Sequence, residues 1–179
     1  MDNKLKVLAI DPGLKNIGIC GMDHNNKIVF WKILSLDIEY KKADLNNLTE
    51  CLLLNLIDLF DDKYEIDTVL IENQPNKLDN RIKFLSIETY TYFNMLKILH
   101  GNIKNIRFIH AKNKLKNYYC KNLSYIQRKK LGIEVTRRYL KHYYKDNLEW
   151  FEENKKKDDL ADSFLYCIDH INLIDPEDL

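Results

Sequence analysis

The sequence predicts an α/β domain built on a mixed five-stranded sheet. Short apolar runs bounded by turn residues alternate with longer segments of helical periodicity, which is typical of this class. The first three runs follow one another too closely for helices to intervene, whereas predicted helices separate the later ones. With 179 residues, 45% of them apolar, the chain is long enough to bury one core, and we expect a single domain over residues 1–179.

The first three strands are predicted to form an antiparallel meander. Residues 5–10 are an almost continuous apolar run that stops at an Asp-Pro-Gly turn, as a buried strand does. Strands over residues 16–22 and 28–33 are separated by the turn formers of residues 23–26, a hairpin-length connection.

The remaining elements are predicted to alternate between helix and strand. Apolar residues recur at threes and fours in the helical segments. Strands joined by crossover helices are expected to lie parallel. The predicted order is helix 44–60, strand 68–71, helix 82–99, strand 106–109 and, after a Lys-rich loop, a basic helix 125–144 and a last helix 158–173.

Charge is distributed unevenly along the chain, although the net charge is only +1. Residues 81–145 hold sixteen Lys and Arg against two acids, which leaves a net charge of −13 on the rest. The basic segment also contains aromatic residues, which predicts a surface for nucleic acid beside a separate acidic cluster. The aromatic residues in question are Tyr118, Tyr119, Tyr125, Tyr139, Tyr143 and Tyr144.

Several other classes are disfavoured. No apolar run reaches the roughly 18 residues that a membrane span needs, and the N-terminal residues do not resemble a signal peptide. We therefore expect a soluble intracellular protein that does not associate with membranes. The four cysteines are widely spaced and do not group with the histidines, so neither a disulfide framework nor a zinc site is indicated. An actin-like ATPase is disfavoured as well, because that fold would need two such domains and a second phosphate loop.

Acidic side chains stand where ligand sites form in α/β sheets. Asp11 follows the first strand and Glu72 follows the fourth, each at a carboxyl end. In the last helix Asp159 and Asp162 lie three residues apart on one flank, and spacing alone leaves Asp158 with Asp162 as an alternative pair. Singly, these acids have ordinary explanations as turn residues or helix N-terminal charges.

Together the carboxylates point to a metal site. Like charges that converge from separate elements repel unless cations neutralise them. Oxygen donors without His or Cys suit Mg²⁺, with Mn²⁺ as a substitute, and two such ions can support phosphodiester cleavage. No small-molecule cofactor is indicated.

Four segments resemble the signatures of RuvC-like Holliday-junction resolvases. They are AIDPGLKNIG at 9–18, VLIENQP at 69–75, QRKK at 127–130 and KKDDLADS at 156–163. The last two are most similar to the poxvirus resolvases. The resemblance implies an RNase H-like fold and a Mg²⁺-dependent homodimer that nicks four-way DNA in pairs. It further implies a viral protein, present in the cytoplasm of the infected cell or in the virion.

The resemblance also assigns residues. It implies that Asp11, Glu72, Asp159 and Asp162 are the metal ligands, which favours Asp159 over Asp158. It places a basic residue beside the scissile phosphate, at Lys129 or Lys130. The bacterial members carry an aromatic wedge after the second acid, where this chain has residues 73–76, NQPN, so Phe84, Tyr118 or Tyr119 are the candidates to open the junction.

Two further alternatives remain at the level of sequence. A non-catalytic module could bind branched DNA through the basic segment alone, although all four acids are present. An RNA-processing nuclease of the same fold would carry similar acids.

A homodimer is also favoured by the substrate itself. A four-way junction must be cut on two opposed strands, and the chain holds one set of four acids. The helices over 82–99 and 125–144 carry more apolar and aromatic residues than one core face needs, and the first of them is the predicted interface. The alternative is that these residues complete the core of the chain. They include Phe84, Ile87, Tyr90, Tyr92, Phe93 and Leu96.

Overall fold

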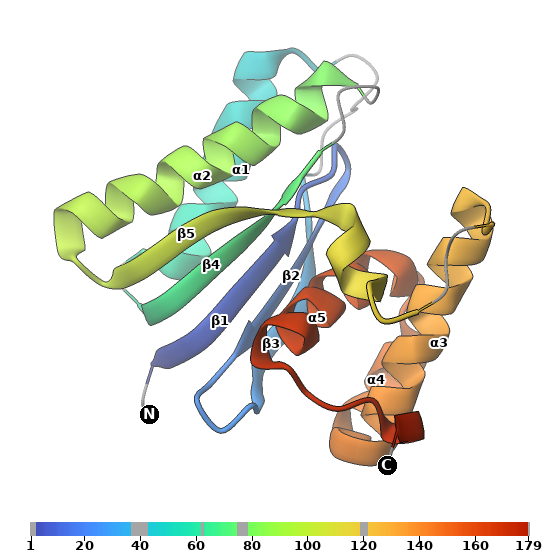
Figure 1. The fold of residues 1–179 in the computed structure, drawn as a ribbon. Coiled ribbons are helices and arrows are strands. Elements are labelled where there is room, and N and C mark those ends of the chain that lie inside the picture. The colour runs from blue at the N-terminus through green and yellow to red at the C-terminus, as the bar shows by residue number, and fades with distance from the viewer. Residues whose placement is uncertain (1–2, 37–42, 62, 75–78, 119–121, 179) are drawn as a thin grey trace.

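The fold is known from a computed structural model, which describes residues 3–36, 43–61, 63–74, 79–118 and 122–178. Five strands form one mixed sheet in the order β3-β2-β1-β4-β5 (Figure 1). The strands are β1 Lys4–Asp11, β2 Asn16–Met22, β3 Ile28–Ser35, β4 Glu65–Asn73 and β5 Ile103–His110. The predicted α/β class with a mixed five-stranded sheet is confirmed.

Strand directions follow from the length of each connection. The β1–β2 and β2–β3 pairs are antiparallel, as the short links predict. The β1–β4 and β4–β5 pairs are parallel, because a crossover helix precedes β4 and another precedes β5. The carboxyl ends of β1 and β4 therefore meet at one edge of the sheet.

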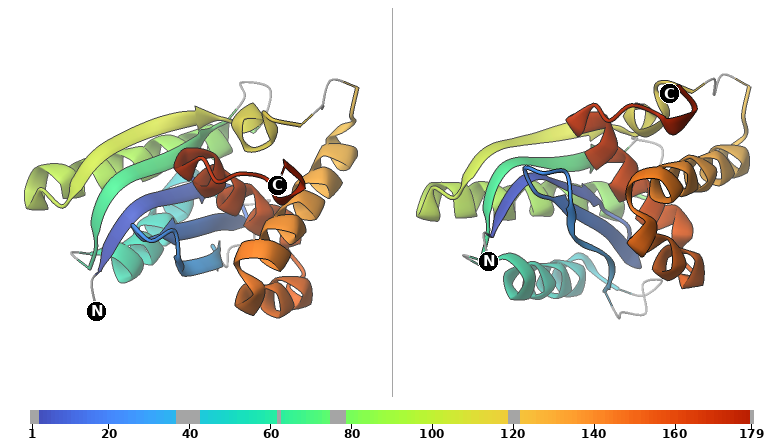
Figure 2. Two further views of the ribbon diagram at one scale, coloured as in Figure 1. Left: turned by 60° about the horizontal axis from the view of Figure 1, so that its bottom comes forward. Right: turned by 90° about the horizontal axis from the view of Figure 1, so that it is seen from below.

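Helices cover both faces of the sheet (Figure 2). One face carries α1 Leu45–Phe60 and α2 Asn80–His100, and α5 Lys157–Ile171 lies across the other. Helices α3 Tyr125–Tyr143 and α4 Leu148–Glu153 pack against α5. Short 3₁₀ helices occupy Ala111–Leu115 (η1), Lys145–Asn147 (η2) and Pro176–Asp178 (η3). In the described part of the chain, no helix combines the length and the hydrophobicity that crossing a bilayer requires.

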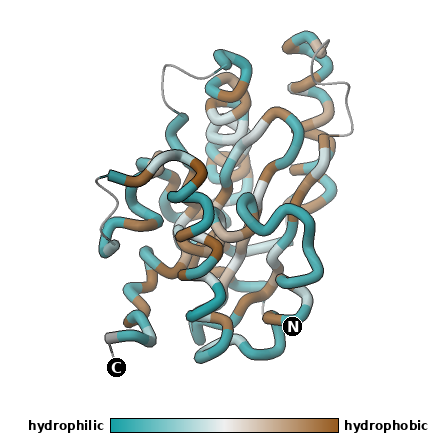
Figure 3. Tube along the Cα trace, turned by 90° about the vertical axis from the view of Figure 1, so that its right-hand side faces the viewer, coloured by the Kyte–Doolittle hydropathy of each residue, from teal (hydrophilic) through white to brown (hydrophobic). Residues whose placement is uncertain are grey.

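Each face of the sheet has its own apolar core. On the α1–α2 side, Leu8 and Ile10 pack with Leu52 and Phe93. On the other side, Trp31 packs beneath α4 and α5, where its ring stacks on Phe151 at a centroid distance of 5.2 Å. In Figure 3 hydrophobic and hydrophilic residues alternate closely along the helices, as expected for elements with one buried side.

The predicted interface helix contributes more to the core than the sequence indicated. Tyr92, Phe93 and Leu96 are buried against the sheet, so they complete the core of the chain and are not available to a partner. Phe84 and Tyr90 are half-buried. Of the six residues in the prediction, Ile87 is the exposed one, with 48% of its surface accessible.

Candidate metal centre

The candidate centre lies at the carboxyl edge of the sheet, where two parallel strands bring their acids together. Asp11 is the last residue of β1, and Glu72 is the penultimate residue of β4. The two strands are paired in register up to Ile10 and Ile71, so the acids that follow are neighbours. Both acids are placed by the backbone of the sheet.

Helix α5 crosses the sheet closely enough to bring a third acid to this edge. Gly18 of β2 makes that approach possible, because a Cβ there would lie 2.3 Å from the backbone oxygen of Asp159. The indole of Trp31 donates a hydrogen bond to the Leu160 carbonyl at 2.9 Å and holds the first turn of the helix. The position of α5 is thus fixed from β2 and β3.

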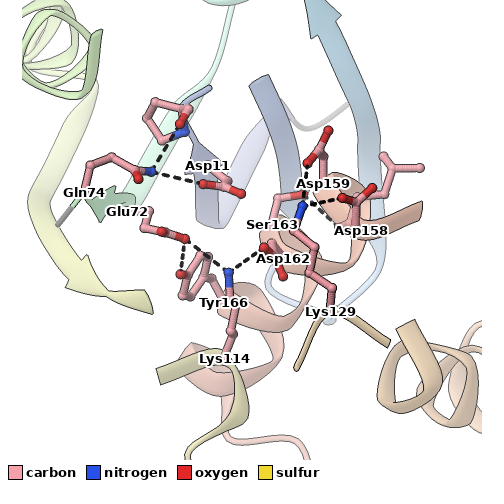
Figure 4. A network of polar contacts seen from close by, with 12 residues as sticks. Asp11, Glu72, Gln74, Lys114, Lys129, Asp158, Asp159, Asp162, Ser163 and Tyr166 are labelled. Carbon is pink, nitrogen blue, oxygen red and sulfur yellow. Dashed lines mark hydrogen bonds and ion pairs between the residues drawn. The ribbon is translucent and has the colours of Figure 1, made fainter. Parts of the chain in front are cut away.

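Three of the four expected ligands converge. Asp11, Glu72 and Asp162 each offer a carboxylate oxygen, and these oxygens lie within 4.8 Å of one another (Figure 4). Asp159 lies beside this triad and outside it, where it accepts a hydrogen bond from the Asn16 amide at 3.5 Å. Asp158 also lies outside the triad, and its carboxylate pairs with Lys129.

The two basic candidates differ in their surroundings. Lys129 is half-buried, and its ammonium contacts Asp158 and lies 4.0 Å from Asp159. Lys130 is exposed. The sequence left these two residues open, and the geometry places Lys129 beside the acidic residues.

A lysine that the sequence pattern does not single out bridges two acids of the triad. Lys114 of η1 contacts Asp162 and lies 3.3 Å from Glu72 Oε2. Its side chain is 15% exposed. It was one of several lysines in a predicted loop, and no local pattern distinguishes it, because its partners are 42 and 48 residues away in the chain.

Two further polar side chains support the triad. Gln74 is buried and donates its amide to the Pro12 carbonyl at 3.1 Å and to Asp11 Oδ1 at 3.4 Å. Tyr166 is buried, and its hydroxyl donates a hydrogen bond to Glu72 Oε2. Tyr166 stands four residues after Asp162 on α5, and this helical spacing was the signal that could have revealed it.

Crowding raises the pKa of several of these carboxylates. Burial, followed by the charges of Glu72 and Asp162, raises the pKa of Asp11 well above its usual value. Burial raises the pKa of Asp162 to about 6, although the Lys114 ammonium opposes the shift. Burial and then the neighbouring Asp158 also raise the pKa of Asp159.

The pKa of Lys114 is raised as well, which for a lysine favours the charged form. Burial alone would lower the pKa of Lys114, but the charges of Asp162, Glu72 and Asp11 raise it. Lys114 is therefore a permanent ammonium among three carboxylates. The site is built to hold positive charge, and its oxygen donors fit a hard divalent cation such as Mg²⁺ or Mn²⁺.

The basic segment is less separate from the acids than its sequence suggested. At least seven of its sixteen cations pair with acids in the described residues, including Lys116 with Asp169 and Arg138 with Glu177. Four of these pairs form because η1, the residue after it and α3 pack against α5 and the C-terminal residues, where many of the acids lie. Exposed cations remain at Lys112, Lys130 and Lys141.

The tyrosines of the basic segment differ in their exposure to solvent. Tyr139 is buried and Tyr144 packs against the core, whereas Tyr125 is 65% exposed and its ring lies 5.2 Å from the Lys129 ammonium. Among the candidates to open the junction, Phe84 and Tyr118 are half-buried. Tyr119 and residues 75–76 lie outside the described residues.

Comparison with known proteins places this arrangement in a family. The family model for the poxvirus A22 protein matches residues 6–174, nearly the whole chain and every acid of the site. The chain belongs to the poxvirus A22 protein family. The expected relationship to poxvirus proteins is therefore confirmed.

The chain is also similar to one curated viral protein and to resolvases of known structure. A segment of 115 residues, 56% of the chain, is 30% identical to the uncharacterized protein L451 of Acanthamoeba polyphaga mimivirus and covers 28% of that protein. The yeast mitochondrial Holliday junction resolvase Ydc2 has a similar structure, with a TM-score of 0.63 and 19% identity over 92% of this chain and 78% of Ydc2.

The structure of the bacterial resolvase RuvC is also similar to that of this chain. Thermus thermophilus RuvC in complex with a Holliday junction substrate has a TM-score of 0.51 and 12% identity, with 92% of both chains covered. A second structure of T. thermophilus RuvC gives a TM-score of 0.53 and 12% identity over 93% of this chain and 96% of RuvC. These similarities confirm the RNase H-like fold.

Proposed function

We propose that this protein is a metal-dependent endonuclease that resolves four-way DNA junctions by paired nicking. The observation that carries the proposal is the acidic triad, in which three carboxylates from three elements lie within 4.8 Å of one another. Membership of the poxvirus A22 family and the resolvase fold support the substrate class. The DNA would be an intermediate of viral replication or recombination in the infected cell.

Asp11, Glu72 and Asp162 would hold the divalent ions, and Asp159 would complete the set at the rim of the triad. Two bound Mg²⁺ or Mn²⁺ ions would supply an activated water and charge stabilisation for an in-line displacement at phosphorus. The fold of the chain holds these ligands in place. The sheet edge fixes Asp11 and Glu72, and α5 carries Asp159 and Asp162 across it.

Basic residues would bind the DNA backbone around the acids. Lys129 is the candidate to contact the scissile phosphate, because it lies at the acidic rim next to Asp158 and Asp159. Exposed cations such as Lys130 and Lys141 would make positioning contacts with phosphates, which carry no sequence information.

We further propose that the active species is a homodimer. One chain holds one acidic triad among its described residues, and a junction must be cut on two opposed strands. A closed two-fold assembly presents two equivalent sites without a second domain.

The direct test is a cleavage assay on three substrates. Purified protein is incubated with a synthetic four-way junction, a linear duplex and an RNA–DNA hybrid, each with Mg²⁺ and with EDTA. We expect paired nicks in the junction that require Mg²⁺, and far less cleavage of the other two. Preferred cleavage of the hybrid would instead favour an RNA-processing nuclease, and junction binding without cleavage would favour a non-catalytic module.

Variants on one helix make the assay specific to the site. Asp162→Asn is expected to abolish cleavage and spare junction binding, because binding depends on phosphate contacts elsewhere. Asp169→Asn, also on α5 but paired with Lys116, is the matched control and should cleave like the wild type. Cleavage by Asp162→Asn at the wild-type rate would contradict the metal assignment.

A further inference from the structure

The buried hydroxyl of Tyr166 is the feature of the centre whose role the proposed reaction does not assign. Tyr166 is 1% exposed and lies on the same side of α5 as Asp162, one helical turn further on. Its hydroxyl points at Glu72, which belongs to a different element (Figure 4). A polar group at this depth needs a hydrogen-bond partner, and Glu72 provides it.

Two donors bind the same oxygen of Glu72. The Tyr166 hydroxyl and the Lys114 ammonium both reach Oε2, the latter at 3.3 Å, so neither of them engages Oε1. The Lys114 nitrogen also lies 5.4 Å from the centre of the Tyr166 ring, within the range of a cation–π contact. Tyr166 therefore contacts both the acid and the cation that neutralises it.

We propose that Tyr166 is a positioning residue that fixes the carboxylate of Glu72 by binding Oε2 and leaves Oε1 directed to a metal ion. The proposal rests on the metal-dependent function above and deepens it. Hydrogen bonds from neighbouring groups to a metal-ligating carboxylate set its orientation, and their removal costs about 10- to 100-fold in metal affinity or activity. Tyr166 suits this role because its ring is packed on every side and holds the hydroxyl in place.

A role in direct contact with DNA does not fit this geometry. The residue is almost inaccessible to solvent, and its hydroxyl is already committed to a carboxylate that needs a donor. Tyr166 also couples two elements, because one turn of α5 supplies the ligand Asp162 and the group that orients the β4 ligand Glu72. A shift of α5 would thus alter two ligands together.

The test compares metal affinity in the absence of DNA. Mn²⁺ is titrated into the protein, and free Mn²⁺ is measured by electron paramagnetic resonance. Tyr166→Phe, which removes only the hydroxyl, is expected to weaken Mn²⁺ binding about tenfold or more. Tyr144→Phe is the matched control, because its half-buried hydroxyl donates to the Asn26 carbonyl at 2.9 Å, away from the acids, and its affinity should equal that of the wild type.

A double-mutant cycle tests whether Tyr166 acts through Glu72. In a Glu72→Gln background, where the ligand is already lost, Tyr166→Phe should cause no further loss of Mn²⁺ affinity. An equal loss in both backgrounds would overturn the proposed link to Glu72. Cleavage by Tyr166→Phe should require about tenfold more metal than cleavage by the wild type and recover at saturating metal.

The outcomes separate this proposal from the proposed function. If the wild-type protein binds Mn²⁺ but cuts no junction, the proposed function is wrong. The Mn²⁺ affinities of the wild type and of Tyr166→Phe would still decide the role of Tyr166. Tyr166→Leu provides a second variant without the hydroxyl if Tyr166→Phe does not fold. Wild-type affinity in a folded variant, failure of both variants to fold, or absence of Mn²⁺ binding by the wild type would overturn the proposal.

Discussion

Asp11 stores unfavourable electrostatic energy in the metal-free protein. Its pKa is raised by burial and by the neighbouring charges of Glu72 and Asp162, so the folded state favours the protonated form. A raised carboxyl pKa contributes stability below the unfolded-state pKa of about 4, and this contribution is lost as the pH rises through the folded-state pKa. The metal-free protein should therefore lose stability from this group as the pH rises above 4.

We predict that Asp11→Asn stabilises the metal-free protein at pH 8. The substitution removes a carboxylate that is repelled by two others, and a gain of about 1 kcal/mol would raise the melting temperature by roughly 2–4 °C. Thermal unfolding in EDTA measures the effect, which should shrink at pH 4, where Asp11 is protonated in the wild type. A melting temperature at pH 8 equal to or below the wild-type value would contradict this account.

Lys114 has the opposite effect on stability. Removing one partner of a buried ion pair leaves uncompensated charge and typically costs about 3–5 kcal/mol. We therefore predict a loss of that size for Lys114→Met in EDTA at pH 8, partly restored by Mg²⁺. Lys116→Met is the matched control, because Lys116 pairs with Asp169 at a side-chain exposure of 49% and should cost at most about 1 kcal/mol.

Three lysines of α3 are predicted to separate catalysis from binding. If Lys129 contacts the scissile phosphate, Lys129→Ala should lower the cleavage rate at saturating DNA more than the affinity, because charge develops there in the transition state. Lys141→Ala should weaken binding and flatten its salt dependence, with little change in the saturated rate. Lys130→Ala, which removes an exposed cation, should behave like Lys141→Ala. Equal effects of all three on affinity alone would contradict the role of Lys129.

Sequence pattern identified the acids but not the groups that surround them. Asp11 and Glu72 could be placed because each directly follows an apolar strand, and the topology of parallel strands then brings them together. The contribution of Lys114 and Gln74 depends on contacts with residues 42 or more positions away in the chain, which no local periodicity encodes. Tyr166 has one local signal, its helical spacing from Asp162, but its contact with Glu72 spans 94 residues. Whether Asp159 ligates a metal stays a prediction, since Asp159 lies outside the triad.

At the scale of the elements, the approach of α5 to β2 fixes the centre. We predict that Gly18→Ala reduces both stability and cleavage, because the added methyl would lie 2.3 Å from the Asp159 carbonyl oxygen and push the helix outward. Overpacking of this kind costs about 1–3 kcal/mol. Gly101→Ala serves as the control. A Cβ at Gly101 meets no other atom, but its φ of +67° is unfavourable for alanine, so this variant should lose stability without losing cleavage.

The measurement combines thermal unfolding with junction cleavage per folded molecule. Gly18→Ala should reduce cleavage at a temperature where the protein remains folded, because α5 carries Asp159 and Asp162. Gly101→Ala should cleave normally at the same temperature. Normal cleavage by a folded Gly18→Ala protein would show that the acids tolerate displacement of α5.

Long elements were predictable, and short ones were not. The long helices and the five strands occur where apolar periodicity places them, with ends that differ by up to three residues. Strand β5 extends over Ile103–His110 although most of its residues are exposed, because backbone pairing with β4 does not require apolar side chains. Helix α4 and the turn η1 were missed, since six and five residues are too few to show a period.

At the scale of the whole molecule, helix α2 has a second apolar stripe that faces away from the core. Ile87, Met95 and Ile98 are 48%, 46% and 75% exposed, and their spacing puts them on one side of the helix. The half-buried Phe84 extends the same stripe. The predicted interface helix is retained, although the residues available to a partner differ from those that the sequence indicated.

Our final prediction concerns assembly through this stripe. A second copy of the chain is the proposed occupant, because a two-fold junction needs two sites and the described residues form one acidic triad. Ile87→Glu combined with Ile98→Glu should convert the dimer to a monomer in light scattering at micromolar concentration, since charges at the centre of an apolar interface lack partners. Ile174→Glu is the control, because Ile174 is 56% exposed and follows α5 on the opposite side of the sheet.

The cleavage pattern links assembly to function. The monomeric double variant should keep the metal affinity of the wild type, because α2 contributes none of the triad. Its nicks should be single and uncoupled, since one site reaches one strand in each binding event. A wild-type protein that is strictly monomeric in solution, yet nicks both strands within one binding event, would exclude the two-fold arrangement and leave the exposed stripe of α2 without this explanation.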